Sequence, residues 1–214
     1  MTARALDPLE GVTIRWARSA AREGGDPEAF ARLYDHIAPS VLTWAQLRVR
    51  GPERAVLAPT DLVQEVWMRA WRRIEDFNAD QVPFRFWVFR IAKNVLLEAN
   101  RQARRPDRRA PTGLPRDEGD QDPLAQVADT ITAVSKRLAK DENLGRFMDF
   151  VNGLPDDDRA LVLHCGLEGL PLKDVGARLG ISEDAATKRW QRLRARLREA
   201  PALQDLPEHL LVSG

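Results

Sequence analysis

A run of cationic side chains near the C-terminus is the part of the sequence best suited to chemistry. No acidic residue interrupts positions 188–198, and the cations there are Lys188, Arg189, Arg192, Arg194, Arg196 and Arg198. Lysine and arginine donate to phosphate oxygens and to base edges, so a basic stripe on a domain of balanced charge is typical of nucleic-acid binding. A solvated basic face of a helix explains the charge run alone equally well.

The residues that usually perform catalysis or bind metals do not converge in this sequence. His36, His164 and His209 are scattered, and Cys165 is the single cysteine. One cysteine excludes an internal disulfide, and no histidine–cysteine–acid spacing indicates a metal site or an activated nucleophile. We therefore expect no catalytic residue, no metal and no cofactor, and the sequence does not predict an enzyme.

Helix signals around the cationic run predict a helix-turn-helix. A helix over residues 172–179 ends at Gly180, which can adopt the left-handed conformation of a helix C-cap, and Ser182 is a good N-cap for the next helix. The spacing of apolar residues in that second helix predicts a buried stripe of Ala186, Trp190, Leu193 and Leu197. In a DNA-binding helix-turn-helix this second helix enters the major groove. An ordinary helical hairpin with an exposed basic side is the alternative.

Bulk composition describes a soluble globular protein of the all-α class. The chain has 214 residues, 43% hydrophobic and 30% charged, with a formal net charge of +1. No strand-like alternation of any length appears, and helical spacing of apolar residues runs through both halves. Apolar runs are far too short to span a membrane and the N-terminus lacks a signal-peptide core, so we expect a cytoplasmic protein.

Changes of composition divide the chain into two small helical domains joined by a flexible linker. The linker begins with PDRRAPTGLPRDEGDQD, which has almost nothing to bury. The predicted parts are an N-terminal extension (1–25), a first domain (26–105), the linker (106–143), a helix-turn-helix domain (144–200) and a C-terminal tail (201–214).

Capping signals predict three helices in the first domain. Asp26 followed by Pro27 opens the first helix, which runs to about Val49, and Thr60 or Asp61 caps the second. The third helix runs from about residue 84 to 105. Phosphorylation of Thr60 would add charge to the edge of its helix, but an N-cap is the simpler interpretation of this threonine.

Longer motifs in both halves are more specific than the helix-turn-helix. The first half contains FARLYDHIAPSVL, DLVQEVWMRAWRRIEDFN and FRFWVFRIAKNVLLEANRQARR, in that order. The second contains LPDDDRALVLHCGLEGLPLKDVGARLGISEDAATKRWQRLRARLRE. In these segments the chain resembles the extracytoplasmic-function (ECF) sigma factors, bacterial transcription initiation factors with two domains. The resemblance covers about residues 26–105, as their region 2, and 144–199, as their region 4.

The resemblance implies that one helix docks on RNA polymerase core, against the clamp helices of the β′ subunit, with further contacts to the β subunit. The matching residues are Asp61, Leu62, Gln64, Glu65, Trp67, Arg69 and Trp71. Acids can pair with basic groups of a partner, and exposed tryptophans are common interface anchors. Part of this stripe is equally expected to be core.

The resemblance also implies two DNA-reading surfaces. The loop 78–83 and the helix after it match the part of the family that captures the opened minus-ten element, through Asn78, Phe84, Arg85, Trp87, Arg90, Lys93, Asn94 and Arg101. The recognition helix would read the minus-thirty-five element as duplex, through Ser182, Glu183, Asp184, Ala185, Thr187, Lys188, Arg189, Gln191 and Arg192. Residues 185–188 depart from the family pattern, so a promoter sequence cannot be transferred.

The expected partners are therefore RNA polymerase core and promoter DNA, and the sequence leaves open whether a separate anti-sigma protein restrains the chain. We expect no homo-oligomer and no insertion into a membrane. A stand-alone helix-turn-helix regulator, with the first half as a sensing or interaction domain, is the alternative function. Such a regulator would bind a duplex site tightly without polymerase, whereas a small sigma factor should not.

Overall fold

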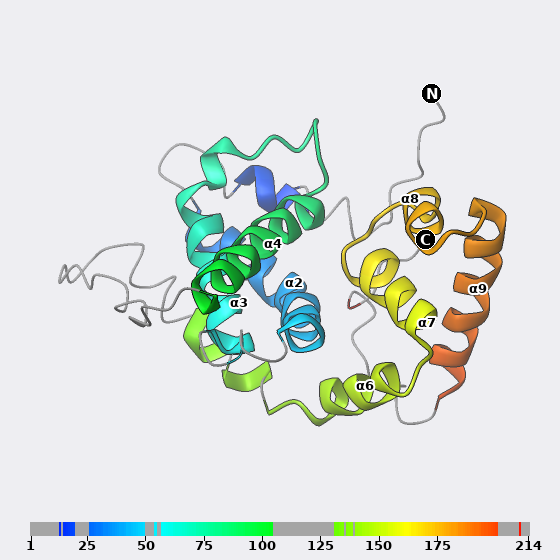
Figure 1. The fold of residues 1–214 in the computed structure, drawn as a ribbon. Coiled ribbons are helices and arrows are strands. Elements are labelled where there is room, and N and C mark those ends of the chain that lie inside the picture. The colour runs from blue at the N-terminus through cyan, green and yellow to red at the C-terminus, as the bar shows by residue number, and fades with distance from the viewer. Residues whose placement is uncertain are drawn as a thin grey trace.

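The chain folds into two groups of helices in a computed structural model that describes residues 13, 15–19, 26–49, 54, 57–104, 131–134, 136–138, 140–200 and 210. All regular structure in these residues is helical, which confirms the all-α prediction. The first group comprises α2 (Pro27–Arg48), α3 (Pro59–Arg72), η2 (Ile74–Asp76) and α4 (Phe84–Ala103). The second comprises α6 (Glu142–Asn152), α7 (Asp156–Leu161), the π-helix η3 (Val162–Leu167), α8 (Leu172–Leu179) and α9 (Glu183–Glu199). Figure 1 shows α2, α3 and α4 gathered on one side and α7, α8 and α9 on the other.

The start of α2 follows the predicted capping pattern. The carboxylate of Asp26 accepts a hydrogen bond from the backbone N–H of Ala29 (3.0 Å) and one from the hydroxyl of Ser19 (2.7 Å). These two bonds hold the pKa of Asp26 below its ordinary value, because they favour the charged form. The cap also satisfies one of the backbone donors that every helix leaves unpaired at its N-terminus.

The prediction that Thr60 or Asp61 caps α3 is wrong. The helix begins at Pro59, and its N-cap is Ala58, with no hydrogen bond from a cap side chain. Proline suits the first helical position because its φ is already helical and its missing N–H would have had no partner there. Thr60 therefore lies within the first turn of α3.

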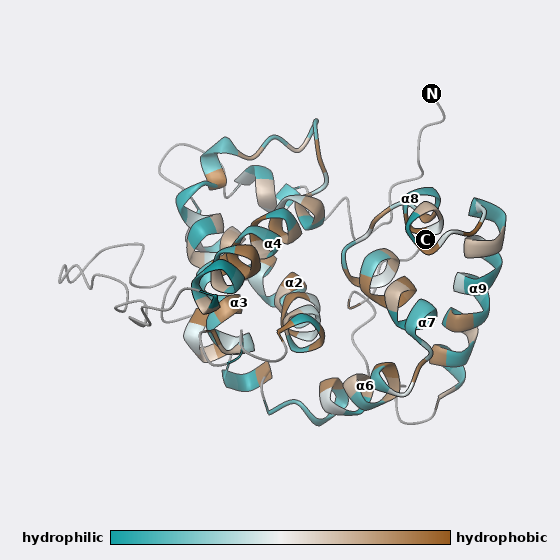
Figure 2. Ribbon diagram, in the orientation of Figure 1, coloured by the Kyte–Doolittle hydropathy of each residue, from teal (hydrophilic) through white to brown (hydrophobic). Residues whose placement is uncertain are grey.

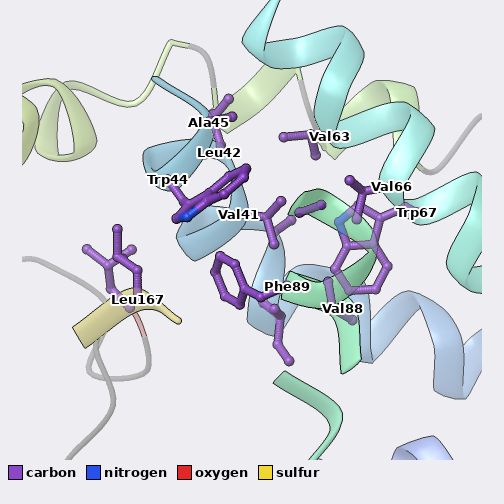
Figure 3. Packing of buried hydrophobic residues seen from close by; sticks show 14 of the residues in the cluster. Val41, Leu42, Trp44, Ala45, Val63, Val66, Trp67, Val88, Phe89 and Leu167 are labelled. Carbon is purple, nitrogen blue, oxygen red and sulfur yellow. The ribbon is translucent and has the colours of Figure 1, made fainter. Parts of the chain in front are cut away.

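Trp67 lies at the centre of an aromatic cluster that joins the helices of the first group. Its ring contacts Phe30 and Tyr34 of α2 edge to face, with centroids 5.6 and 4.8 Å apart, and Phe84 of α4 at 6.2 Å. These separations are the ones that aromatic pairs prefer. Figure 3 shows the Trp67 ring packed beside Val88 of α4. The side chain is fully buried, so it holds α2, α3 and α4 together.

The second group contains the predicted helix-turn-helix. Gly180 has a φ of 69°, and the Ser182 hydroxyl accepts from the backbone N–H of Ala185 at 3.2 Å. A Cβ added at Gly176 would lie 3.0 Å from the carbonyl oxygen of Ile181, so α8 approaches the turn closely there. The predicted stripe is buried, which confirms the register of α9: Ala186, Trp190, Leu193 and Leu197.

The C-terminal end of the predicted linker, 106–143, contains helical residues that contact the first group. Residues 131–134 and 136–138 are helical, and the hydroxyl of Tyr34 in α2 donates to the carbonyl of Ile131 at 2.8 Å. The buried side chains of this segment are Ile131, Val134 and Leu138. Their spacing of three and four residues places them on one face of a helix. The earlier part of the linker lies outside the described residues, as do most of the N-terminal extension and of the tail.

A buried carboxylate joins the two groups of helices. Glu168, directly after η3, accepts hydrogen bonds from the indole N–H of Trp44 in α2 (2.7 Å) and pairs with the ammonium of Lys93 in α4 (2.7 Å). The His164 ring lies 3.2 Å from the same carboxylate. The Glu168 side chain is fully buried. Burial alone raises the pKa of Glu168, but hydrogen bonds from His164, Lys93 and Trp44 outweigh it and lower the pKa to about 2.

The free energy of unfolding should show whether Trp67 acts as a core residue or as a surface residue. Trp67→Ala should lower it by about 3–5 kcal/mol, because it removes a large buried ring. Trp67→Phe should cost far less, because the indole N–H of Trp67 has no hydrogen-bond partner to lose among the described residues. Urea denaturation measures both, with Trp71→Ala as the control at a half-buried position. Equal losses for Trp67→Ala and Trp71→Ala would contradict the central place of Trp67.

The low pKa of Glu168 predicts how its contribution to stability depends on pH. The charged form is favoured in the folded chain, so the contribution is complete above the ordinary pKa of 4.5 and is lost as pH falls toward about 2. We expect Glu168→Gln to lower the free energy of unfolding at neutral pH by about 1–3 kcal/mol. The deficit should shrink below pH 4.5, and urea titrations of both proteins across this range measure it. Glu75→Gln, at an exposed position, is the control, and a deficit that does not change with pH would refute the assignment.

Candidate nucleic-acid and polymerase interfaces

The outer face of α9 is polar and accessible. Figure 2 shows hydrophilic residues along much of this helix. Of the residues that the sequence assigns to duplex DNA, Thr187 and Arg189 are half-buried, and the exposed ones are Ser182, Glu183, Asp184, Ala185, Lys188, Gln191 and Arg192. By helical register, Lys188, Gln191 and Arg192 lie opposite the buried stripe, so α9 has a core side and a solvent side. Such a helix can enter a major groove with its polar side.

Arg189 ties α9 to α7. Its Nε donates to Asp158 Oδ1 at 2.5 Å and its Nη1 to Asp157 Oδ2 at 2.8 Å. The hydrogen bond to Asp158, followed by the one to Asp157, raises the pKa of Arg189. Asp158 is almost fully buried, and Arg196 also lies 3.7 Å from it. In this conformation Arg189 positions α9, and its cation is already matched by two carboxylates.

Lys188 and Arg192 are more available than Arg189. The ammonium of Lys188 pairs with Asp184 one turn earlier at 2.8 Å, but both side chains are more than two-thirds exposed, at 68% and 75%. An exposed pair of this kind contributes little and can be exchanged for another anion. Arg192 donates to the carbonyl of Lys188 at 3.4 Å. These two cations are therefore the best placed on α9 to contact phosphates or bases.

The loop before α4 is a tight turn built on Asn78. Its side-chain oxygen accepts from the backbone N–H of Asp80 at 2.9 Å, and its carbonyl accepts from Gln81 and Val82. Asparagine commonly organises a turn by hydrogen bonding two residues ahead. Asn78 itself and most of the loop are exposed, and the Asp80 carboxylate pairs with Arg18. The loop is therefore a preformed, solvent-facing feature next to the start of α4.

The predicted minus-ten residues on α4 fall into three classes. Phe84 is buried in the aromatic cluster, where it contacts Trp67. Trp87 is half-buried, and Arg85 and Lys93 are bound to the second group of helices, Arg85 through the carbonyl of Leu167 at 2.9 Å. The exposed members are Arg90, Asn94 and Arg101.

A pocket of about 270 Å³ opens on this face of α4. Aromatic rings and valine supply its apolar walls, and two cations and a carboxylate supply its charges. Its lining residues are Val82, Phe86, Trp87, Phe89, Arg90, Lys93 and Glu168. Flat aromatic walls beside cations are the surroundings that an unstacked base and its phosphate require.

The predicted polymerase-binding stripe on α3 is partly core. Leu62 and Trp67 are fully buried, so in this conformation they support the surface from within. Asp61 is exposed at the start of the helix, and the half-buried members are Gln64, Glu65, Arg69 and Trp71. Trp71 packs against Phe30, with ring centroids 4.9 Å apart.

Arg69 links α3 to α4 through two carboxylates. It donates to Glu65 one turn earlier at 2.6 Å, and its two terminal nitrogens donate to the two oxygens of Glu98 at 3.0 and 2.8 Å. This paired geometry is the strongest arrangement of arginine and carboxylate. The hydrogen bond between the two side chains raises the pKa of Arg69 and lowers that of Glu98.

Sequence reasoning missed three acids that matter to these surfaces. Glu98 and Asp158 each bind an arginine of another helix, 29 and 31 residues away, and Glu168 binds across the two groups. No local spacing indicates such pairs, because the partners are brought together only by tertiary packing. The one sequence signal was the acidic run at 156–158, which stands opposite the basic run of α9.

The described residues offer little to catalysis, metal binding or membrane insertion. They contain no cluster of three or more histidine, cysteine or acidic side chains placed to bind a metal. Burial, and then the nearby charge of Glu168, raises the pKa of the Cys165 thiol to about 12, so it is not a ready nucleophile. No helix among them is long and apolar enough to span a bilayer.

Comparisons with known proteins identify both groups of helices. Residues 33–106 match the family model for Sigma-70 region 2, and residues 144–197 match that for Sigma-70, region 4. The chain is 30% identical to the RNA polymerase sigma factor NccH of Alcaligenes xylosoxydans xylosoxydans over 181 residues, which are 85% of this chain and 90% of NccH. It is 29% identical to the ECF RNA polymerase sigma factor SigM of Mycobacterium tuberculosis over 195 residues, 89% of this chain and 88% of SigM.

A solved structure is also similar. The structure of CnrH in complex with the cytosolic domain of CnrY matches with a TM-score of 0.42 and 24% identity, over 86% of this chain and 94% of that one. In sequence, the sigma factor CnrH of Cupriavidus metallidurans is 29% identical over 194 residues, 90% of this chain and 95% of CnrH. Together with the region 2 and region 4 matches, these relatives show that the chain belongs to the ECF group of RNA polymerase sigma factors.

Proposed function

We propose that this sigma factor divides promoter recognition among the three surfaces described above. The exposed edge of α3 binds the clamp helices of the polymerase β′ subunit, the loop 78–83 and α4 take the opened minus-ten strand, and α9 reads the minus-thirty-five duplex. Sigma factors of this family direct RNA polymerase to promoters and are not enzymes. The assignment of each task to a surface is the proposal.

The observation that supports the proposal most is the division of α9 into two sides. Its apolar stripe is fully committed to the core of the second group, while Lys188, Gln191 and Arg192 remain exposed on the other side. Lysine and arginine contact phosphates and guanine edges, and glutamine contacts adenine. A polar helix face of this composition beside a short, glycine-containing turn fits recognition of duplex DNA.

The chemistry of the α4 face supports a different task, which is to hold single-stranded DNA. Extruding a base from a duplex costs a few kcal/mol, so the protein must supply stacking and charge in return. Trp87 and Phe86 provide aromatic surface in the pocket, and Arg90 and Lys93 provide cations at its edge. This combination suits an unstacked nucleotide better than it suits a closed duplex.

The partners follow from these tasks. RNA polymerase and promoter DNA are those of the family, and we propose contacts to both the β′ and β subunits. We further propose that the chain acts in the cytoplasm as a monomer, and that a separate anti-sigma protein restrains it. CnrH, one of its relatives, has been solved in complex with the cytosolic domain of another protein, CnrY.

Transcription in vitro tests the proposal directly. Purified chain and core polymerase should together start transcripts at a promoter mapped by sequencing transcript 5′ ends after overexpression. A gel-shift comparison with and without core should show tight promoter binding only in its presence. Tight duplex binding by the chain alone, with no transcription on adding core, would favour a stand-alone regulator instead.

The α3 edge yields a prediction about polymerase binding. Asp61 is exposed at the start of α3, so Asp61→Lys should weaken binding to core without disturbing the fold. We expect a loss of about tenfold, as reversal of one charge at an interface commonly gives. Fluorescence anisotropy with labelled protein measures the dissociation constant. Asp149→Lys, at an exposed position of α6, is the matched control, and an equal loss in both variants would contradict the assignment.

Substitutions on α9 can distinguish side chains that contact DNA from side chains that hold the helix in place. Replacing Lys188 and Arg192 by alanine should reduce the affinity of the polymerase complex for the mapped promoter and lower the salt dependence of binding, by about one unit of slope for each lost phosphate contact. The stability of the chain should stay within about 0.5 kcal/mol, as for ordinary surface changes.

Arg189→Ala should behave in the opposite way. It leaves the almost fully buried Asp158 without its closest cation, so we expect the free energy of unfolding to fall by about 1–2 kcal/mol. Urea denaturation of the three proteins, followed by promoter binding in complex with core, makes the comparison. A stable Arg189→Ala chain with a large loss of DNA binding would show that Arg189 contacts DNA itself.

A further inference from the structure

Glu168 belongs to the second group of helices by sequence, yet its carboxylate is bound mostly by the first group. The Trp44 indole and the Lys93 ammonium each lie 2.7 Å from it, and the Arg48 guanidinium lies 3.6 Å from it. Only His164, at 3.2 Å, comes from the same group. A fully buried carboxylate with two cations and an indole N–H around it occupies a built anion site, formed by α2 and α4.

Neighbouring contacts seat the same segment on α2 and α4. Leu167, fully buried, lies close to Trp44 and Phe89 in Figure 3. Its carbonyl accepts from Arg85 of α4 at 2.9 Å. Further along the chain, the carbonyl of Leu210 accepts from the hydroxyl of Ser40 in α2 at 2.7 Å, and the Leu210 side chain is buried too. Leu167, Glu168 and Leu210, all from the C-terminal half, therefore contact one face of the first group.

That covered face includes cations that the proposed function assigns to DNA. Lys93 binds the carboxylate of Glu168, and Arg85 binds the carbonyl of Leu167. Glu168 also forms part of the wall of the pocket that contains Trp87 and Arg90. A carboxylate and a DNA phosphate are both anions that accept hydrogen bonds from lysine and arginine. Both cannot occupy the site formed by Trp44, Arg48 and Lys93 at the same time.

We propose that the free chain is closed, with Glu168 in the site on α2 and α4 that receives a phosphate of the promoter strand, so that region 4 must move off region 2 before the minus-ten strand binds. The identity of the competing anion rests on the proposed function, whereas the closed contact rests on the geometry alone. In this conformation the chain inhibits its own binding to single-stranded DNA.

The energetics of the contact suit a reversible closure. Removing a carboxylate from water costs several kcal/mol, so the net stabilisation by its partners is only what remains after that cost. Lys93 and Arg48 are still about 40% exposed, at 40% and 39%, so water can rehydrate both cations as the contact opens. Binding of the two regions to separate places on polymerase could therefore hold the chain open.

The distance between the two groups of helices tests the closure. Two exposed positions, Glu75 after α3 and Arg178 in α8, are changed to cysteine for a donor and an acceptor dye, with Cys165→Ala to leave only these two thiols. Energy transfer is then measured for the chain with Glu168 intact, for Glu168→Gln, and for the matched control Glu199→Gln at an exposed site on α9. We expect a short distance with Glu168 intact and in the control, and a longer one in Glu168→Gln.

Binding of a short fluorescent single-stranded oligonucleotide of mixed sequence tests the competition. At low salt, Glu168→Gln should bind it about tenfold more tightly than the unaltered chain, because a closed protein binds in proportion to its open fraction. Glu199→Gln should bind it as the unaltered chain does. Circular dichroism of each variant confirms that it is folded.

The outcomes distinguish this proposal from the proposed function. The closure is overturned if the unaltered free chain shows the same dye-to-dye distance as Glu168→Gln. It is also overturned if the unaltered chain shows the same distance free and bound to core polymerase, and this second comparison does not depend on whether the variant folds. A variant that opens without gaining affinity for the oligonucleotide overturns the shared anion site. In either case, transcription by the unaltered chain with core would still support the proposed function.

Discussion

A carboxylate that leaves water needs donors on both oxygens, and in this chain that requirement fixes how the two halves meet. Glu168 obtains its donors from α2 and α4 as well as from His164, so η3 can dock in only a narrow range of positions. The apolar contact of Leu167 follows from that docking, because it is the residue next in sequence. A hydrophobic residue at position 168 would remove the polar constraint and leave a less specific contact between the halves.

Two arginines show how a basic sequence can serve structure and binding together. Arg69 holds Glu65 and Glu98, and Arg189 holds Asp157 and Asp158. Each fixes a helix that also carries exposed polar side chains. The charge that a partner meets is therefore smaller than the count of lysine and arginine suggests, and it is concentrated on fewer side chains, such as Lys188 and Arg192 on α9.

Local signals in the sequence were enough to predict the helix-turn-helix in detail. The left-handed Gly180, the Ser182 cap and the stripe ending at Leu197 are all set by neighbours within a few residues, so short-range rules apply. The same rules misplaced the start of α3, where Pro59 and not a polar side chain defines the first turn.

Burial on α3 and α4 could not be predicted in the same way. Leu62, Trp67 and Phe84 carry residue types that suit an interface as well as a core, and only the packing of α2 against them decides. The partners of Arg69, Arg189 and Glu168 depend on helices that are distant in sequence. The family resemblance places the surfaces, but it does not say which of their cations are already bound within the chain.

The π-helix η3 determines the direction in which the Glu168 side chain points. In η3 the backbone N–H of Glu168 bonds to the carbonyl of Leu163, five residues back, so this turn holds one residue more than an α-helical turn. Deleting one residue there would restore α-helical pairing and rotate the following residue by about 100° about the helix axis. The carboxylate would then face elsewhere. The direction of the Glu168 side chain, on which the proposed closure depends, is thus set by the one additional residue in this turn.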